Sequence, residues 1–340
     1  MAVALTPAVD ANLHVIATTA ERGLFPLAPG GDGPADDEAT TADELTGVMD
    51  QASVGQGLLF SSRHHGFDNR YCAAAVARYP DRFAGIANID ATSQGAPDDV
   101  AYWTGDGGLQ GVRLWGGGPL FTDRRAAAVW VNDSRLDPLW DAIRSRGVPC
   151  NAQKTFPELL PATGAVLRRF SGLKLTLNNL AHVPAGQGTA SEAAQKLLAM
   201  AEFPDVYVSF SADFVIHAAR PGSPERQLLM ALIGSFGAGR LCWSAFYPSE
   251  RHRPYQLSAA LVREALSFLP ADDQEQILGG AARSLYPCLA APSLPLDGSA
   301  SGIHRLASRE TGPRQGISGG TAAERGHPPL QMIKEAGNAE

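Results

Sequence analysis

Asp10-Ala11-Asn12-Leu13-His14 opens the first apolar run of the chain. Side chains alternate between the two faces of a strand, so Asn12 and His14 share one face. In a strand of a barrel, that face points inward. Two histidines at this spacing would form a metal-binding clip, but an asparagine stands in the first place. The stretch therefore predicts a barrel strand whose polar pair has been altered.

The composition excludes several classes of protein. The chain has 340 residues, of which 44% are hydrophobic and 19% are charged, enough for a sizeable core. A net charge of −7 and the absence of a basic run argue against a nucleic-acid partner. No apolar run reaches the length of a membrane span, and the N-terminus lacks the order of a signal peptide. The four cysteines form no C-x-x-C pair. We therefore expect reduced thiols in a cytoplasmic protein without a membrane partner.

Eight short apolar runs alternate with amphipathic stretches, which is typical of parallel β/α units. The expected strands span residues 10–16, 57–60, 83–89, 109–115, 148–153, 173–179, 206–211 and 240–246. Eight such units predict a (β/α)8 TIM barrel over residues 1–289. A doubly wound sheet is less favoured because no G-x-G-x-x-G motif opens a first helix. Residues 290–340 are rich in Gly, Ser, Pro and charge and are expected to form a disordered tail.

Two helix starts are predicted from local signals. Asp137 followed by Pro138 is typical of an N-cap and a first helical turn, with Gly147 ending that helix. Asp272 and Glu275 have the spacing of a capping box.

Six segments have the order and spacing of a known family. They are Asp-Ala-Asn-Leu-His at 10–14, Phe-Asp-Asn-Arg-Tyr at 67–71, Tyr-Pro-Asp-Arg-Phe-Ala-Gly at 79–85, Gly-Val-Arg-Leu at 111–114, Arg-Leu-Cys-Trp-Ser-Ala-Phe-Tyr-Pro at 240–248 and Ile-Leu-Gly-Gly-Ala-Ala-Arg-Ser-Leu-Tyr at 277–286. Together they resemble the amidohydrolase-related (amidohydrolase 2) family of the metal-dependent hydrolase superfamily. The resemblance implies a TIM barrel and a hydrolase or carbon–carbon lyase.

The departures from the family pattern fall on its metal site. Members that bind a divalent ion use two histidines of strand one, a histidine of strand six and an aspartate of strand eight. The matching positions here hold Asn12, His14, Asn179 and Phe246. Amides are poor ligands for zinc or manganese, and phenylalanine is none. We therefore expect no metal and no other cofactor, and the usual general base is also missing.

The resemblance directs attention to Arg113 at the end of strand four and to His14. A guanidinium at the barrel mouth can hold a carboxylate through two hydrogen bonds. The imidazole of His14 suits proton transfer. Asn12 and Asn179 would bind the substrate through their amides. The plainer alternatives are an internal ion pair for Arg113, a hydrogen-bonded core histidine, and amides that have no role.

Four further residues are assigned to substrate binding because they follow barrel strands at the mouth. They are His64, Lys154, Asp213 and Phe246. A surface histidine pair, His64 with His65, and a solvated lysine are the plainer interpretations. Ser209 and Ser244 are expected to be hydrogen-bonded barrel hydroxyls, since neither lies in a G-x-S-x-G turn.

Three functions are compatible with this pattern. The first is a metal-independent enzyme that hydrolyses, decarboxylates or isomerises a small carboxylate or lactone. The second is an inert barrel that binds a ligand or regulates a partner. The third is a metal-dependent hydrolase with relocated ligands, drawn from His14, His64, His65, Asp213 and His217. A homodimer is compatible with the resemblance, since dimers are common among similar proteins.

Overall fold

The computed structural model describes residues 7–29, 39–115, 131–152, 155–249 and 253–290. All of them belong to one compact unit, residues 1–298. The expected disordered tail at 290–340 lies outside the described residues, apart from Ala290 at its start.

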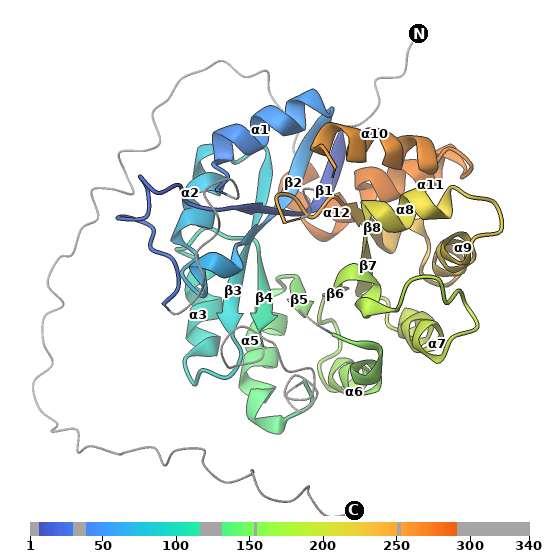
Figure 1. The fold of residues 1–340 in the computed structure, drawn as a ribbon. Helices are drawn as coiled ribbons and strands as arrows, with labels where there is room; N and C mark the ends of the chain where they lie inside the picture. Colours follow the sequence, from blue (N-terminus) through green and yellow to red (C-terminus); the bar gives the residue numbers. More distant parts are fainter. Residues whose placement is uncertain (1–6, 30–38, 116–130, 153–154, 250–252, 291–340) are drawn as a thin grey trace, which may run out of the picture. The chain divides into compact units, whose positions relative to one another are not determined.

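The described part of the chain contains eight strands in one sheet, all parallel and ordered β1 to β8. Their bounds are β1 Ala8–Val15, β2 Val54–Ser61, β3 Phe83–Asp90, β4 Gly111–Trp115, β5 Cys150–Ala152, β6 Leu175–Leu177, β7 Val206–Ser211 and β8 Leu241–Ser244. Figure 1 shows the strands around a common centre with the helices outside them. The prediction of a (β/α)8 barrel is confirmed, and its polar strand ends share one mouth.

The helices surround the strands, except that α12 (Ala281–Leu285) lies near the centre of the barrel (Figure 1). Among the described residues they are α1 Ala42–Gln51, α2 Arg70–Arg78, α3 Ala96–Trp103, α5 Asp137–Arg146, α6 Leu160–Arg169, α7 Glu192–Ala199, α8 Ala212–Ala218, α9 Pro224–Phe236, α10 Tyr255–Ala265, α11 Ala271–Glu275 and α12 Ala281–Leu285. None of the described helices is both long enough and apolar enough to cross a membrane.

The barrel interior has an apolar lower part. A buried cluster joins the strand residues Val9, Leu58, Phe60 and Ile86 to Tyr286, which follows α12. This cluster is separate from the larger core that packs between the strands and the outer helices. Tyr286, at the end of α12, thus closes the barrel at the N-terminal ends of the strands. Polar chemistry is left to the opposite end.

The ring closes through contacts made by β1. Leu13 forms an isolated parallel bridge with Tyr247, and the amide of His14 donates to the Tyr247 carbonyl at 3.0 Å. The Asp10 carboxylate accepts from the Ala245 amide at 3.1 Å and from the Tyr255 hydroxyl at 3.2 Å. We call these contacts the β1–β8 seam.

Both predicted helix starts were wrong, because Asp137 and Asp272 are not the N-cap residues of their helices. Asp137 lies inside the first turn of α5, after Leu136, and pairs with Arg169 at 2.7 Å. A preceding 3-10 turn, Ser134–Leu136, displaces the start of the helix. In α11 the N-cap is Pro270, without a side-chain hydrogen bond. The end of α5 at Gly147 is confirmed, with φ of +64°.

Candidate active site

Arg113 lies inside the barrel on β4. Its side chain is 3% exposed, and its Cζ lies 3.9 Å from the ring centroid of Phe60. A guanidinium over an aromatic face is a favourable cation–π contact. Burial lowers the pKa of Arg113 to about 9. The group therefore stays protonated at neutral pH and supplies a positive charge deep in the mouth.

His14 shares Phe60 with Arg113. Its backbone pairs with Phe60 in the β1–β2 ladder, and its Nδ1 lies 3.1 Å from the Phe60 carbonyl. Burial, and then the charge of Arg113, lower the pKa of His14 to about 3. The imidazole is therefore neutral at pH 7. With its proton on Nδ1 and donated to that carbonyl, Nε2 has a free lone pair.

Asn12 joins the seam to the mouth. Its backbone carbonyl accepts from the Ser244 hydroxyl at 3.2 Å, and its backbone N–H donates to the Asp10 carboxylate at 3.0 Å. Its side-chain oxygen has no hydrogen-bond partner in the described part of the chain. Asp10 is fully buried, which raises its pKa to about 6 despite the hydrogen bonds it accepts. The sequence interpretation gave Asp10 no role, although it heads the motif that identifies the strand.

A polar layer continues around the barrel at the level of Arg113. Arg113 pairs in register with Asn88 on β3 and Asn151 on β5, and Asn151 pairs with Thr176 on β6. All four are buried. Asn151 was missed from the sequence. The signal for it was a polar residue inside an apolar run, and its significance depends on strand register.

Asn179 and Phe246 occupy strained backbone positions. The φ angles of Asn179, Leu180, Ala181 and His182 lie between 48° and 56°, and that of Phe246 is 53°. Left-handed conformations cost a non-glycine residue roughly 1–2 kcal/mol. Strain of this kind gathers at functional sites, where the surrounding structure holds it in place.

The two residues differ from the sequence interpretation in their surroundings. Asn179 is half-buried, and its backbone amide donates to the Ser209 hydroxyl at 3.4 Å. The neighbouring Asn178 is the buried amide, and its oxygen accepts from Ser209 at 2.9 Å. The half-buried Phe246 donates its amide to the Ser244 hydroxyl at 3.0 Å. Both serines are thus hydrogen-bonded, as expected.

The remaining candidates follow other strands of the barrel. His64 is half-buried and sits in the 3-10 turn Arg63–His65 after β2, and its charge lowers the pKa of His14 as a minor cause. Asp213 forms an ion pair with Arg253 at 2.7 Å. Lys154 lies outside the described residues.

His65 is not the surface residue of the plainer interpretation. It is buried, and its Nε2 accepts from the amide of Ala17 at 3.2 Å, while its Nδ1 lies 3.1 Å from the Pro26 carbonyl. Its two ring nitrogens thus hold the segment that follows β1.

The donor groups present do not fit a divalent metal ion. Of the four positions that match the family's ligands, His14 alone offers an imidazole, and Asn12, Asn179 and Phe246 offer two amides and a benzene ring. Across the described residues no three His, Cys, Asp or Glu side chains gather as ligands, which gives relocated ligands no support there.

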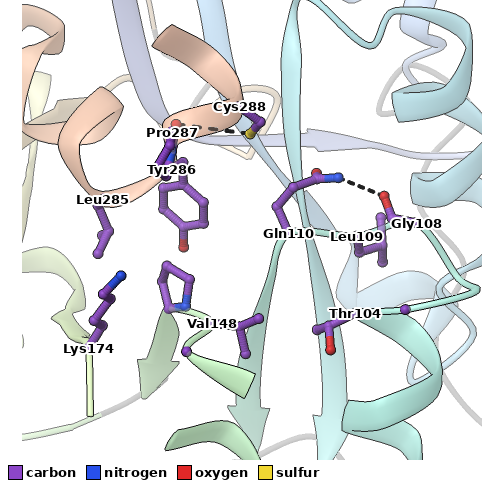
Figure 2. Close-up of a pocket in the computed structure, with 13 residues that line it drawn as sticks. Thr104, Gly108, Leu109, Gln110, Val148, Lys174, Leu285, Tyr286, Pro287 and Cys288 are labelled. Atoms are coloured by element: carbon purple, nitrogen blue, oxygen red, sulfur yellow. Dashed lines mark hydrogen bonds between the residues drawn. The ribbon is translucent and has the colours of Figure 1, made fainter. Parts of the chain in front are cut away.

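A separate hollow lies at the opposite end of the barrel. It has a volume of about 450 Å³, and its lining includes residues that directly precede β4, β5 and β6, namely Gln110, Pro149 and Lys174. Figure 2 shows Lys174 and Tyr286 on one side and Thr104 and Gln110 on the other. The side-chain oxygen of Gln110 accepts from the Gly85 amide, and its side-chain nitrogen donates to the Gly108 carbonyl. Barrel enzymes place their chemistry at the other end.

The sequence family follows from a match over most of the barrel. The model of the amidohydrolase family matches residues 9–288. The chain belongs to the amidohydrolase family. The family match includes both the residues of the mouth and those that close the barrel below.

Three relatives indicate the range of this enzyme family. The L-fucono-1,5-lactonase of Burkholderia ambifaria is 24% identical over 83% of this chain and 96% of its own length. An amidohydrolase from Burkholderia multivorans with bound zinc has a TM-score of 0.63 at 18% identity, covering 84% of this chain and 100% of its own. The 5-carboxyvanillate decarboxylase of Sphingomonas paucimobilis has a TM-score of 0.59 at 16% identity, covering 82% and 98%. The two structures support the fold.

Proposed function

We propose that this member of the family acts without a metal ion on a small lactone or carboxylate. The observation that carries the proposal is that Arg113 and His14 contact the same residue, Phe60: Arg113 lies over its ring, and the His14 imidazole lies beside its carbonyl. The proposal is supported by two relatives, an L-fucono-1,5-lactonase and a 5-carboxyvanillate decarboxylase, whose names indicate a lactone and a carboxylate as substrates. Lactone hydrolysis is the reaction that the neutral imidazole suits best.

Arg113 would anchor the substrate. Its guanidinium can hold a carboxylate through two hydrogen bonds or polarise a lactone carbonyl. Removal of the substrate from water strengthens both contacts, because the site is buried. A bound carboxylate would also offset the charge that lowers the pKa of His14.

His14 would move the proton. In lactone hydrolysis, water attacks the carbonyl carbon while Nε2 accepts a proton from that water. The ring C–O bond then breaks, and the departing oxygen receives the proton to give a hydroxy acid. The Phe60 carbonyl would fix the imidazole by accepting from Nδ1, and the side-chain N–H groups of Asn12 and Asn179 would donate to the substrate carbonyl.

Binding and turnover by Arg113→Met test the proposal. Methionine keeps apolar packing on Phe60 and removes the charge. With a panel of small carboxylates and lactones, we expect the ligand-induced rise in melting temperature to disappear and acid release to fall by about 100-fold, the effect of losing a charged hydrogen bond of up to 3 kcal/mol. Arg144→Met on the exposed face of α5 is the matched control.

Metal dependence is tested on the same protein. We expect turnover to survive dialysis against a chelator and to gain nothing from added zinc or manganese. Stoichiometric metal that activates the protein would contradict metal independence. Ligand binding without turnover would favour the inert, ligand-binding barrel, and equal binding by wild type and Arg113→Met would contradict the assigned anchor.

A further inference from the structure

Among the described residues of the barrel, two buried amide oxygens lack a hydrogen-bond partner. They belong to Asn12 and Asn151, whose side chains are 1% and 2% exposed, and neither oxygen has a partner among the described residues. More than nine in ten buried polar groups in proteins are hydrogen-bonded, so each exception calls for a physical reason.

Strand register places Asn151 on the inner face beside Arg113, and alternation along β1 places Asn12 on the inner face with His14. Asn151 is the direct β5 neighbour of Arg113, and paired residues of parallel strands project to the same side of the sheet. Arg113 packs on Phe60, a member of the interior cluster. His14 pairs with Phe60, and Asn12 is two residues away on the same face.

Other amides in the interior have partners. Asn88 donates to the carbonyls of Ser61 and Gly66 at 2.9 and 3.0 Å, and Asn178 accepts from Ser209 at 2.9 Å. These two amides, which have a structural role, therefore find hydrogen-bond partners within the barrel. Of the two unpartnered oxygens, that of Asn12 is on β1, the strand of His14, and that of Asn151 is on β5, the strand next to that of Arg113.

We infer that Asn151, together with Asn12, accepts hydrogen bonds from hydroxyl groups of the substrate and so selects hydroxylated lactones and acids. The inference rests on the proposed function, because Arg113 holds the carbonyl or carboxylate end. An amide oxygen needs a donor, and carbonyl and carboxylate oxygens cannot donate. A hydroxyl group on a neighbouring carbon of the substrate can.

Asn151→Leu removes the acceptor and keeps a branched side chain with the same number of non-hydrogen atoms. The probes are D-glucono-1,5-lactone, which carries hydroxyl groups, and δ-valerolactone, which has the same six-membered lactone ring and no hydroxyl group. We expect kcat/KM for the hydroxylated lactone to fall about 10- to 100-fold, the loss that follows when a buried hydrogen bond to a substrate goes unmade. The value for δ-valerolactone should stay within about twofold, because that substrate never used the acceptor.

The free protein gives an independent readout. Leucine removes an unsatisfied polar group from a buried site, so the ligand-free Asn151→Leu variant should melt no lower than wild type. Asn178→Leu is the control, since its oxygen is already bonded within the barrel. That variant should melt lower and should not change the ratio of the two kcat/KM values.

The outcomes separate this inference from the proposed function. An unchanged selectivity ratio in Asn151→Leu, with Arg113→Met still inactive, overturns the inference and leaves the anchor intact. A lower melting temperature with unchanged selectivity assigns Asn151 to a structural water and also overturns it. If the wild-type protein hydrolyses neither lactone, the test is the rise in melting temperature caused by D-gluconate, which carries hydroxyl groups, compared with that caused by pentanoate, which carries none. No preference for gluconate, or one retained in Asn151→Leu, overturns the inference.

Discussion

The imidazole of His14 is neutral for two separable reasons. Burial makes the protonated form unfavourable, and the positive charge of Arg113 adds to that effect. The first cause belongs to the barrel and the second to one side chain. Because Phe60 contacts both groups, a substrate carboxylate that reaches Arg113 also changes the electrostatic surroundings of His14.

The His14 titration should respond to Arg113. In Arg113→Met we expect the His14 pKa to rise from about 3 and to stay below 6.5, since burial is the larger cause. Imidazole NMR signals followed from below pH 3 up to pH 7 measure it. Arg63→Met is the matched control, because the exposed Arg63 is the last and smallest of the causes. An unchanged titration in Arg113→Met would show that the two groups are not coupled.

At the scale of elements, the order of strands and helices was predictable and the details of their ends were not. Apolar runs that alternate with amphipathic ones already predict eight β/α units. The strands β5 and β6, however, contain three residues each, and the chain enters left-handed conformations soon after β6. The capping box belongs to Thr41 and Glu44 at α1 rather than to α11.

The candidate site was predictable only in part, for a related reason. His14 and Arg113 could be proposed because each lies in a motif with a family resemblance. Asn151 could not be proposed, because its place beside Arg113 depends on how β4 pairs with β5, and the two paired residues are 38 positions apart in the sequence. Burial of Asp10 and its contacts across the seam also depend on distant segments.

Helix ends offer a test with a matched pair of substitutions. Ser53 follows α1 with a φ of 54° and is exposed, so Ser53→Gly should stabilise the protein by up to about 1 kcal/mol. Gly147 follows α5 with a φ of 64°, and an added Cβ would meet no atom within 4 Å. Gly147→Ala should therefore destabilise by about 1 kcal/mol through backbone conformation alone. Urea denaturation measures both, and changes of the same sign would contradict the explanation.

At the scale of the whole molecule, the seam sets a pH dependence. The folded pKa of Asp10 is raised from 3.8 to about 6, so folding favours its protonated form, and the associated stability is lost as pH rises through 6. His14 has the opposite sign. Its pKa is lowered from 6.5 to about 3, so its contribution is present above pH 6.5 and is lost as pH falls.

Asp10→Asn isolates the contribution of the seam. His14 is present in both proteins, so the difference in unfolding free energy between variant and wild type reports Asp10. We expect that difference to move in favour of the variant by about 3 kcal/mol between pH 4 and pH 7, the equivalent of the raised pKa. Urea denaturation at pH 4, 5.5 and 7 measures it. A difference that is independent of pH would show that Asp10 keeps its ordinary pKa in the folded state.

The seam also governs the time at which the barrel can close during synthesis. Asp10 and the Ala245 amide are 235 residues apart, and the Tyr255 hydroxyl lies 245 residues from Asp10. At roughly 5–20 residues per second, translation separates the appearance of these partners by on the order of ten seconds or more. Throughout that interval β1 has a free edge that can pair with other chains. A chain that ends before Ala245 therefore has no partner for its first strand on that side.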